Sequence, residues 1–251
     1  MRSAARTFPG RDHRYDVVVV GAGLTGTEAA LGCAAAGLDT LLVTTSLDTL
    51  YTLFDKTKLD ESQLEVLNSP TLLHDLNAEL ADEHGFVDPW ALHRGGKYTL
   101  EHTPGVHLLQ SSVSTLIVTA SAVEGVTTWE GVPRRGRRTA LCVGSFLEAR
   151  LRVGSLVDTA GRLSEMAYDD LYEDLCAHGL GFAAAQREVE GPLPYSVAFQ
   201  TFASSERTGF RLNRLEHLYA AGLCADPPLT YEQSAVQGRE LAAALIADLR
   251  G

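Results

Sequence analysis

Short apolar runs alternate with alanine-rich or amphipathic stretches in the first part of the chain. Residues 15–20 and 40–43 are apolar and rich in β-branched side chains, which is typical of strands buried within a parallel sheet. Residues 24–36 between them are good helix formers, and Gly37 follows where a helix would end. The pattern therefore predicts a βαβ unit of the usual size.

The pattern is less regular after the second strand. It predicts, in turn, loops, two helices and one strand: 48–70, 71–84, 88–101 and 106–109. Asp88 suits the capping position of the second helix, and Pro89 suits its first position. These elements extend the βαβ unit.

Strand-like composition and short turns then predict a β-meander over three segments: 113–119, 123–129 and 139–143. Four arginines flank Gly136: Arg134, Arg135, Arg137 and Arg138. We expect this cluster at the tip of a hairpin, in solvent, with contact to a phosphate as the alternative. The last third predicts a strand, a helix, a possible small sheet with loops, a strand and a long helix: 155–158, 168–178, 181–215, 218–221 and 231–249.

Composition narrows the class of protein. The 251 residues carry a formal charge of -11, and a field of that sign repels phosphate backbones, so a broad RNA-binding surface is not expected. No apolar stretch reaches the length of a membrane span. The four cysteines are scattered, which favours a reduced, cytoplasmic setting over a disulfide framework. No histidine, cysteine and carboxylate residues have metal-ligand spacing, so we expect no metal.

A glycine-rich turn joins the first predicted strand to the first predicted helix. Gly21 allows a tight turn, Gly23 lets the backbone approach a pyrophosphate, and Gly26 lets helix and strand pack closely. The helix N-terminus offers unpaired N–H groups to the anion. The alternative is a turn that binds nothing.

The end of the second strand departs from the usual dinucleotide site. An acid normally stands there to bind the ribose, but this chain has Thr44, Thr45 and Ser46, with Asp48 a little beyond. Glu28 in the first helix is also unusual for a simple dehydrogenase. Both features argue against a generic NAD domain.

Four stretches resemble, in order, the glucose-inhibited division protein A family. The first contains GAGLTGTEAA and TLLVTTSLDTL, and the others read GVHLLQSSVSTLIV, TALCVGSFLEARLRVG and LYAAGLCADPPLTYEQSAVQG: 15–50, 105–118, 139–154 and 218–238. Members of that family are FAD-dependent tRNA-modification enzymes. The resemblance implies an FAD cofactor and an α/β fold: a three-layer ββα, FAD/NAD(P)-binding Rossmann-like domain with a parallel central sheet and a β-meander.

The resemblance also implies a role for particular positions. The residues that would cradle the pyrophosphate are Gly21, Ala22, Gly23, Leu24, Thr25 and Gly26. Those that would line the adenosine are Thr44, Thr45 and Ser46 at the ribose and the backbone of Val113 at the adenine. Those that would pass close to the cofactor, near the flavin or near the ribityl chain are Gly144, Ser145, Gly161, Arg162, Glu165, Gly222, Leu223 and Gln233.

The resemblance is incomplete. The family has a cysteine-bearing segment after the second strand, where this chain reads YTLFDKTKLDES. The family's RLKTGTPPR segment, second nucleotide-binding insertion and helical C-terminal region for tRNA are also not matched. We therefore expect residues 1–14 to be a flexible tail and 15–251 a single FAD-binding domain, in which about 163–217 form a small irregular subregion.

These observations favour an FAD-dependent oxidoreductase that lacks the tRNA-binding region, with NAD(P)H as a possible electron donor. A non-catalytic flavin-binding subunit or sensor and a plain NAD-dependent dehydrogenase are the alternatives. Binding of tRNA by this chain alone is not expected, and a protein partner or homo-oligomer stays open. Cys224, before the last helix, is either a redox thiol facing the flavin or a small residue in a turn.

Overall fold

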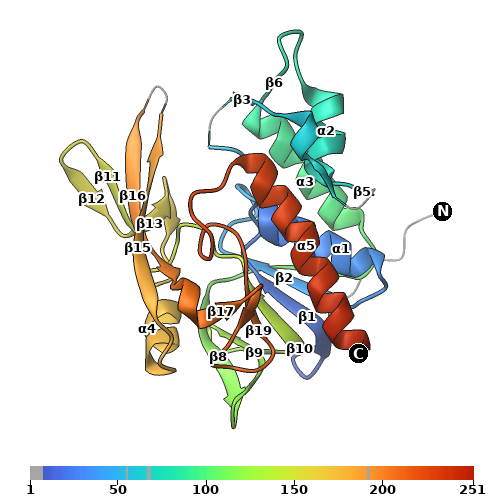
Figure 1. Ribbon diagram of the computed structural model, residues 1–251, viewed down its shortest axis with the longest axis vertical. Helices are drawn as coiled ribbons and strands as arrows, with labels where there is room; N and C mark the ends of the chain where they lie inside the picture. The colour runs from blue at the N-terminus through green and yellow to red at the C-terminus, as the bar shows by residue number, and fades with distance from the viewer. Residues whose placement is uncertain (1–7, 55, 67–68, 191–192) are drawn as a thin grey trace.

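A nine-stranded sheet organises the molecule, as Figure 1 shows for a computed structural model that describes residues 8–54, 56–66, 69–190 and 193–251. Its centre consists of five parallel strands in the order β19-β10-β1-β2-β7. Their bounds are Leu218–Ala220, Pro133–Leu141, Arg14–Val20, Thr40–Thr44 and Val106–Gln110. All five residues of β2 are buried, which explains its uninterrupted apolar pattern.

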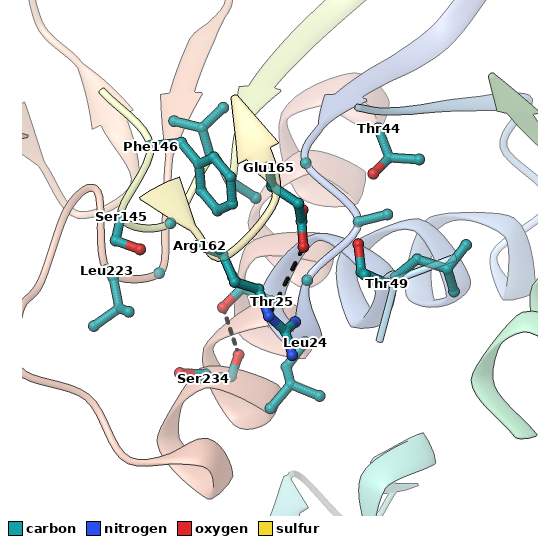
Figure 2. A pocket seen from close by; sticks show the side chains of 18 of the residues that line it. Leu24, Thr25, Thr44, Thr49, Ser145, Phe146, Arg162, Glu165, Leu223 and Ser234 are labelled. Atoms are coloured by element: carbon teal, nitrogen blue, oxygen red, sulfur yellow. Dashed lines mark hydrogen bonds and ion pairs between the residues drawn. The ribbon is translucent and has the colours of Figure 1, made fainter. Parts of the chain in front are cut away.

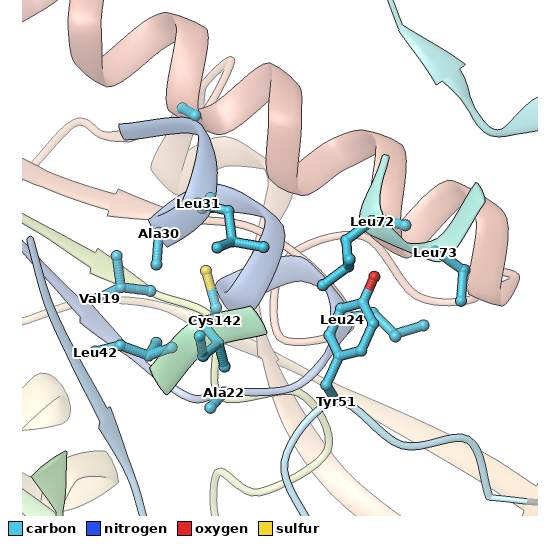
Figure 3. Packing of buried hydrophobic residues seen from close by; sticks show 14 of the residues in the cluster. Val19, Ala22, Leu24, Ala30, Leu31, Leu42, Tyr51, Leu72, Leu73 and Cys142 are labelled. Atoms are coloured by element: carbon cyan, nitrogen blue, oxygen red, sulfur yellow. The ribbon is translucent and has the colours of Figure 1, made fainter. Parts of the chain in front are cut away.

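The central sheet, which contains β1, lies between a layer of helices and the β-meander. Val17 and Val19 pack with the helices α1 (Leu24–Ala35) and α5 (Tyr231–Arg250). Figure 3 shows this face, where Ala30 and Leu31 of α1 lie over Val19 and the neighbouring Leu42. Val18 and Val20 face the other way, toward the meander strands β8 (Val113–Thr119) and β9 (Ala122–Thr128). The expected ββα architecture is confirmed.

The arginine cluster does not form a hairpin tip, and that prediction was wrong. Residues 134–138 lie within β10, which pairs with β9 on one side and β1 on the other. Arg135 binds Glu124 at 3.1 Å, Arg137 binds Asp16 at 3.2 Å, and Arg138 binds Asp248. Several arginines can lie in one strand here because carboxylates of neighbouring segments balance their charges.

A second sheet occupies the other end of the molecule (Figure 1). Its strands β12, β11, β16 and β15 are Leu156–Asp158, Arg150–Val153, Tyr195–Phe202 and Phe182–Val189. The hairpin β15–β16 pairs continuously from Phe182 with Phe202 to Val189 with Tyr195. The segment expected to be irregular, about 163–217, therefore contains regular antiparallel structure.

The remaining elements are short or connect these sheets. The helices α2, α3 and α4 are Leu72–Leu80, Pro89–His102 and Asp169–Ala177, and the 3-10 turns η1 and η2 are Glu61–Gln63 and Ser204–Glu206. The short strands β3, β4, β5, β6, β13, β14, β17 and β18 are Thr57–Lys58, Glu65–Val66, Ser69–Pro70, Phe86–Val87, Ala160–Arg162, Glu165–Met166, Arg207–Thr208 and Arg211–Leu212. Asp88 caps α3 by accepting from Ala91 N–H at 2.8 Å, as its sequence predicted. The helix α2 ends before 84 because Asp82 accepts the backbone N–H groups of His84 and Phe86 in a turn.

Part of the predicted flexible tail is fastened to the domain. Residues 1–7 lie outside the described residues, but His13 contacts the Asp39 carboxylate at 2.5 Å. His107 of β7 contacts the other oxygen of Asp39 at 2.8 Å. Arg14 already belongs to β1, so the tail is shorter than expected.

Glu28 ties three segments together inside the helical layer. It is fully buried on α1 and accepts hydrogen bonds from the Tyr51 hydroxyl at 2.6 Å and from the Leu73 backbone at 3.1 Å. Arg239 of α5 binds its second oxygen at 2.7 Å. Burial raises the pKa of the Glu28 carboxyl, and the positive charge of Arg239 opposes that rise. The carboxylate therefore fixes α1, α5 and the loop containing Tyr51 in one arrangement.

Glu28→Ala should reduce the free energy of unfolding by about 3 kcal/mol, because it leaves the Arg239 guanidinium and the Tyr51 hydroxyl without their partner. Urea denaturation measures the change. Glu240→Ala, at an exposed position of α5, is the matched control and should stay within about 0.5 kcal/mol of the parent. Equal midpoints for the two variants would show that the network contributes nothing.

Candidate functional site

A pocket lies where four parallel strands end. Its walls follow β1, β2, β10 and β19, the edge of a sheet at which such folds bind ligands (Figure 2). Most of the predicted site residues line it: Gly21, Ala22, Gly23, Leu24, Thr25, Thr44, Thr45, Gly144, Ser145, Arg162, Glu165, Gly222 and Leu223. Positions far apart in the sequence thus meet at one site.

The glycine turn brings backbone close to backbone. A Cβ atom on Gly21, whose φ is +100°, would stand 2.3 Å from the Cys142 carbonyl oxygen. A Cβ atom on Gly26 would stand 1.8 Å from the Gly21 oxygen. Gly23 differs, because nothing lies within 4 Å of a Cβ atom placed there. Gly21 and Gly26 therefore make the turn possible, and Gly23 leaves open space in front of it.

The start of α1 faces that open space. Gly23 is the N-cap residue and supplies no side chain to the helix, and the first turn carries no acidic residue. The first backbone bond of the helix runs from Thr27 N–H to the Gly23 oxygen at 3.0 Å. The preceding N–H groups and the positive end of the helix dipole are suited to a phosphate group. The residues present thus fit a pyrophosphate.

Hydroxyl groups and one carboxylate form another wall. Thr44 is the last residue of β2, Thr45 follows it, and Thr49 lies in the next loop with its hydroxyl beside the Glu165 carboxylate. Arg162 Nε lies 3.8 Å from Glu165 Oε1, yet this buried oxygen accepts no hydrogen bond from any described residue. Burial raises the pKa of the Glu165 carboxyl, and the Thr49 hydrogen bond and the Arg162 charge oppose the rise. An unsatisfied acceptor therefore lies in the wall of the pocket.

Asp48, the acid just beyond β2 in the sequence, does not take part. Its side chain is 92% exposed, and its nearest cation is Lys97, at 3.9 Å. It is absent from the pocket lining. Glu165, from the short strand β14, is the carboxylate that lies beside the hydroxyls at the end of β2.

Five predicted residues do not line this pocket: Gly26, Ser46, Val113, Gly161 and Gln233. Ser46 accepts a hydrogen bond from the Thr44 hydroxyl at 3.1 Å through its carbonyl, and the Gly161 carbonyl accepts from Ser145 at 3.0 Å. Gln233 completes a capping box with Thr230 at the start of α5. Gly26, Ser46, Gly161 and Gln233 therefore support the pocket from behind or from its flank.

Val113 lines an adjacent hollow with Trp129. That hollow shares Glu165 and Tyr168 with the pocket, which Thr45 also lines. The two cavities are therefore neighbours at the end of β2. This arrangement leaves room for an extended ligand but does not test the backbone contact predicted for Val113.

Arg162 lies in the pocket as the sequence predicted, whereas Cys224 is buried outside it. Arg162 lines the pocket, donates from Nη2 to the Leu53 carbonyl at 2.9 Å and lies over the Phe54 ring at 4.7 Å. Cys224 is fully buried, and its thiol donates to the Leu141 carbonyl at 3.4 Å and lies 3.2 Å from the Ala221 carbonyl. Burial raises the pKa of this thiol to about 11, the opposite of what a reactive thiol needs. Burial therefore favours the alternative in which Cys224 is a small residue packed in a turn.

Sequence reasoning missed several lining residues: Thr49, Phe54, Phe146, Tyr168, Arg187, Tyr231 and Ser234. Thr49 and Tyr231 belong to stretches that resemble the family, so a closer comparison would have found them. Phe54 and Arg187 carry no such signal, because only the packing of the second sheet brings them to the pocket.

The described residues contain neither a cluster of metal ligands nor a helix suited to span a membrane. No three His, Cys, Asp or Glu side chains there gather as metal ligands would. None of the helices there combines the length and the apolar character that a membrane crossing requires.

The turn, the helix N-terminus and the hydroxyl wall define a Rossmann-type protein that binds a dinucleotide. The chain belongs to the family described as Glucose inhibited division protein A, whose profile matches residues 16–56 and 82–186. FAD is the cofactor of this family and of this chain, and the open cradle in front of Gly23 accommodates its pyrophosphate.

Curated relatives share part of their length with this chain. A tRNA uridine 5-carboxymethylaminomethyl modification enzyme MnmG from Chlamydia caviae is 31% identical over 185 residues, or 66% of this chain and 30% of the relative. The enzyme of the same name from Alkaliphilus oremlandii is 31% identical over 170 residues, or 57% of this chain and 26% of the relative. The chain thus spans about 30% of the length of the curated relatives it matches.

Solved structures agree on the fold. The GidA-related protein from Thermus thermophilus is 36% identical, with a TM-score of 0.80 over 94% of this chain and 100% of that chain. The GidA structure from Aquifex aeolicus has a TM-score of 0.75 over 93% of this chain and 64% of that chain. Its identity is 14%, so it supports the fold alone.

Gly23→Val should yield a folded protein without FAD. The backbone at Gly23, with φ of -70°, suits any residue, and the added side chain would enter the space that the pyrophosphate needs. Visible absorption and thermal unfolding of the purified variant measure both properties. Gly26→Ala is the contrasting variant and should lose stability as well, because its Cβ atom meets the Gly21 carbonyl. A yellow Gly23→Val protein with full occupancy would refute the assignment.

Proposed function

We propose that the chain is an FAD-dependent oxidoreductase whose flavin accepts electrons from NAD(P)H. The observation that carries this proposal is the pocket itself, in which the cofactor cradle continues into a space lined by Phe54, Arg187 and Tyr231. That space offers a place for a second molecule beside the cofactor. FAD supplies the redox chemistry when bound, and the protein supplies orientation and electrostatics.

We propose further that Glu165 replaces the missing ribose acid of the second strand. Its buried Oε1 has no hydrogen-bond donor among the described residues, and it lies in the wall that contains Thr45 and Thr49. A buried acceptor without a donor costs about 1–3 kcal/mol. A ribose hydroxyl group would remove that cost.

A flavin-binding subunit that works only with a partner is the second candidate. Leu156 and Val157 favour it, because they are 74% and 53% exposed on the edge strand β12. Anaerobic addition of NADH or NADPH to the yellow protein distinguishes the two functions. Loss of visible flavin absorbance supports the oxidoreductase, and unchanged absorbance with both donors supports the subunit.

Glu165→Ala should remove the preference of the FAD-free protein for ADP over 2′-deoxy-ADP. In the parent protein that preference should be about tenfold, or about 1.4 kcal/mol for one hydrogen bond. Calorimetric titration measures it. Asp48→Ala is the matched control, because that acid is exposed and should leave the preference intact. If the variant instead loses its preference for riboflavin over lumiflavin, Glu165 faces the ribityl chain and the ribose assignment is wrong.

Binding of bulk tRNA by this chain alone should be weak. The net charge is -11, and Arg135, Arg137 and Arg138, once expected at an exposed tip, are held by carboxylates. Filter binding at moderate salt, followed by nucleoside analysis after incubation with a one-carbon donor, measures affinity and modification. Removing the charges of Arg135 and Arg137 together should change the affinity little. Tight, salt-sensitive binding with a modified uridine would contradict this expectation.

A further inference from the structure

One end of the pocket gathers two guanidinium groups around an aromatic ring. Arg162 lies over the Phe54 ring at 4.7 Å, and Arg187 of β15 lies over the same ring at 4.0 Å. Arg187 is also 5.5 Å from the ring of Tyr231, the first residue of α5. The Tyr231 hydroxyl accepts the Phe54 N–H at 3.1 Å and fixes the loop beneath the ring.

Among the residues that the structure describes, this end of the pocket carries more positive than negative charge. Arg162 has Glu165 as its partner, but Arg187 forms no ion pair with a carboxylate among the described residues, which exclude residue 55. Eight other arginines do have such a partner: Arg135, Arg137, Arg138, Arg150, Arg207, Arg211, Arg214 and Arg239. Arg187 thus lies half-buried in the pocket with no carboxylate partner among the described residues.

The charges of Arg162 and Arg187 also act on a neighbouring phenol, that of Tyr195. Tyr195 of β16 is buried, and this burial raises the pKa of its hydroxyl. The charges of Arg162 and Arg187 both act in the opposite direction. The Glu165 charge acts in the same direction as burial, so two cations and one carboxylate share this region. A further anion close to both arginines would reduce the repulsion between them.

We infer that Arg187 and Arg162, with Phe54 beside them, form a subsite for the anionic group, carboxylate or phosphate, of the molecule that exchanges electrons with the flavin. The inference rests on the proposed function. Phe54 and Tyr231 add flat apolar surface, so the ligand has a planar group next to its charge. Phe54 and Arg162 lie within the residues that the family profile matches, and Arg187 lies just beyond them.

A purely structural role for Arg187 makes a different prediction. Stacking on Phe54 alone would fasten the loop to the second sheet, and its loss would lower thermal stability without changing the choice of ligand. An anion subsite instead distinguishes ligands by charge. The comparison of a charged ligand with its neutral isostere separates the two roles.

Benzoate and benzamide are suitable probes, since both are planar and only benzoate is charged. Titration of the FAD-loaded protein, followed through the visible flavin spectrum and by calorimetry, should show benzoate binding at least about tenfold tighter than benzamide. Arg187→Gln should abolish this preference, and Arg187→Lys should retain part of it. Arg152→Gln removes an exposed arginine of β11, in the same sheet as β15, and should leave the preference unchanged. Inorganic phosphate should compete with benzoate in the parent protein.

The inference is overturned if the parent protein binds both probes equally or not at all. It is overturned as well if the preference survives in Arg187→Gln or disappears equally in Arg152→Gln. Reduction of the flavin by NAD(P)H is measured in a separate experiment from the binding of benzoate and benzamide. A protein that is reduced but shows no preference refutes only the subsite, whereas one that keeps the preference but is not reduced refutes the oxidoreductase.

Discussion

The close approach of backbone to backbone around α1 is the constraint on which the site depends. A Cβ atom on Gly238 of α5 would stand 2.3 Å from the Thr25 carbonyl oxygen, so α5 lies directly against the first turn of α1. Thr25 then donates its hydroxyl to the Ser234 carbonyl at 2.8 Å. These contacts bring the N-terminal ends of two helices to the same pocket. The positions of Gly222, Tyr231 and the cofactor cradle all follow from that arrangement.

Local signals predicted the parts of the fold that depend on neighbours in the sequence. The turn around Gly21 and the cap at Asp88 were recognisable because the chemistry of each lies within a few residues. All four valines of β1 are apolar because both faces of the strand are covered. Val17 and Val19 face the helices, and Val18 and Val20 face the meander. The ββα order followed from the elements and from the resemblance to the family.

Other parts depend on partners distant in the sequence and were not predictable in the same way. Arg135 and Arg138 read as an exposed tip because Glu124 and Asp248, which pair with them, lie 11 and 110 residues away. Position alone placed Cys224 before a helix, but burial decides its chemistry. The strand β15 lacks a clear alternation because nearly all of its positions are exposed or only partly buried. Its partner β16 does alternate, with Tyr195, Val197 and Phe199 buried at every second position.

The two ends of the pocket arise from different parts of the molecule, which explains what family membership does and does not determine. The cradle follows strands of the central sheet, and its turn lies within the matched residues 16–56. The other end combines Phe54 with Arg187 of the second sheet and Tyr231 of α5, and the last two lie beyond the matched residues. A change in β15 can therefore alter the charge beside the flavin without disturbing the backbone contacts that hold FAD. For this reason membership of the family accounts for the cofactor, while the proposed choice of reaction partner depends on how the second sheet and α5 meet Phe54.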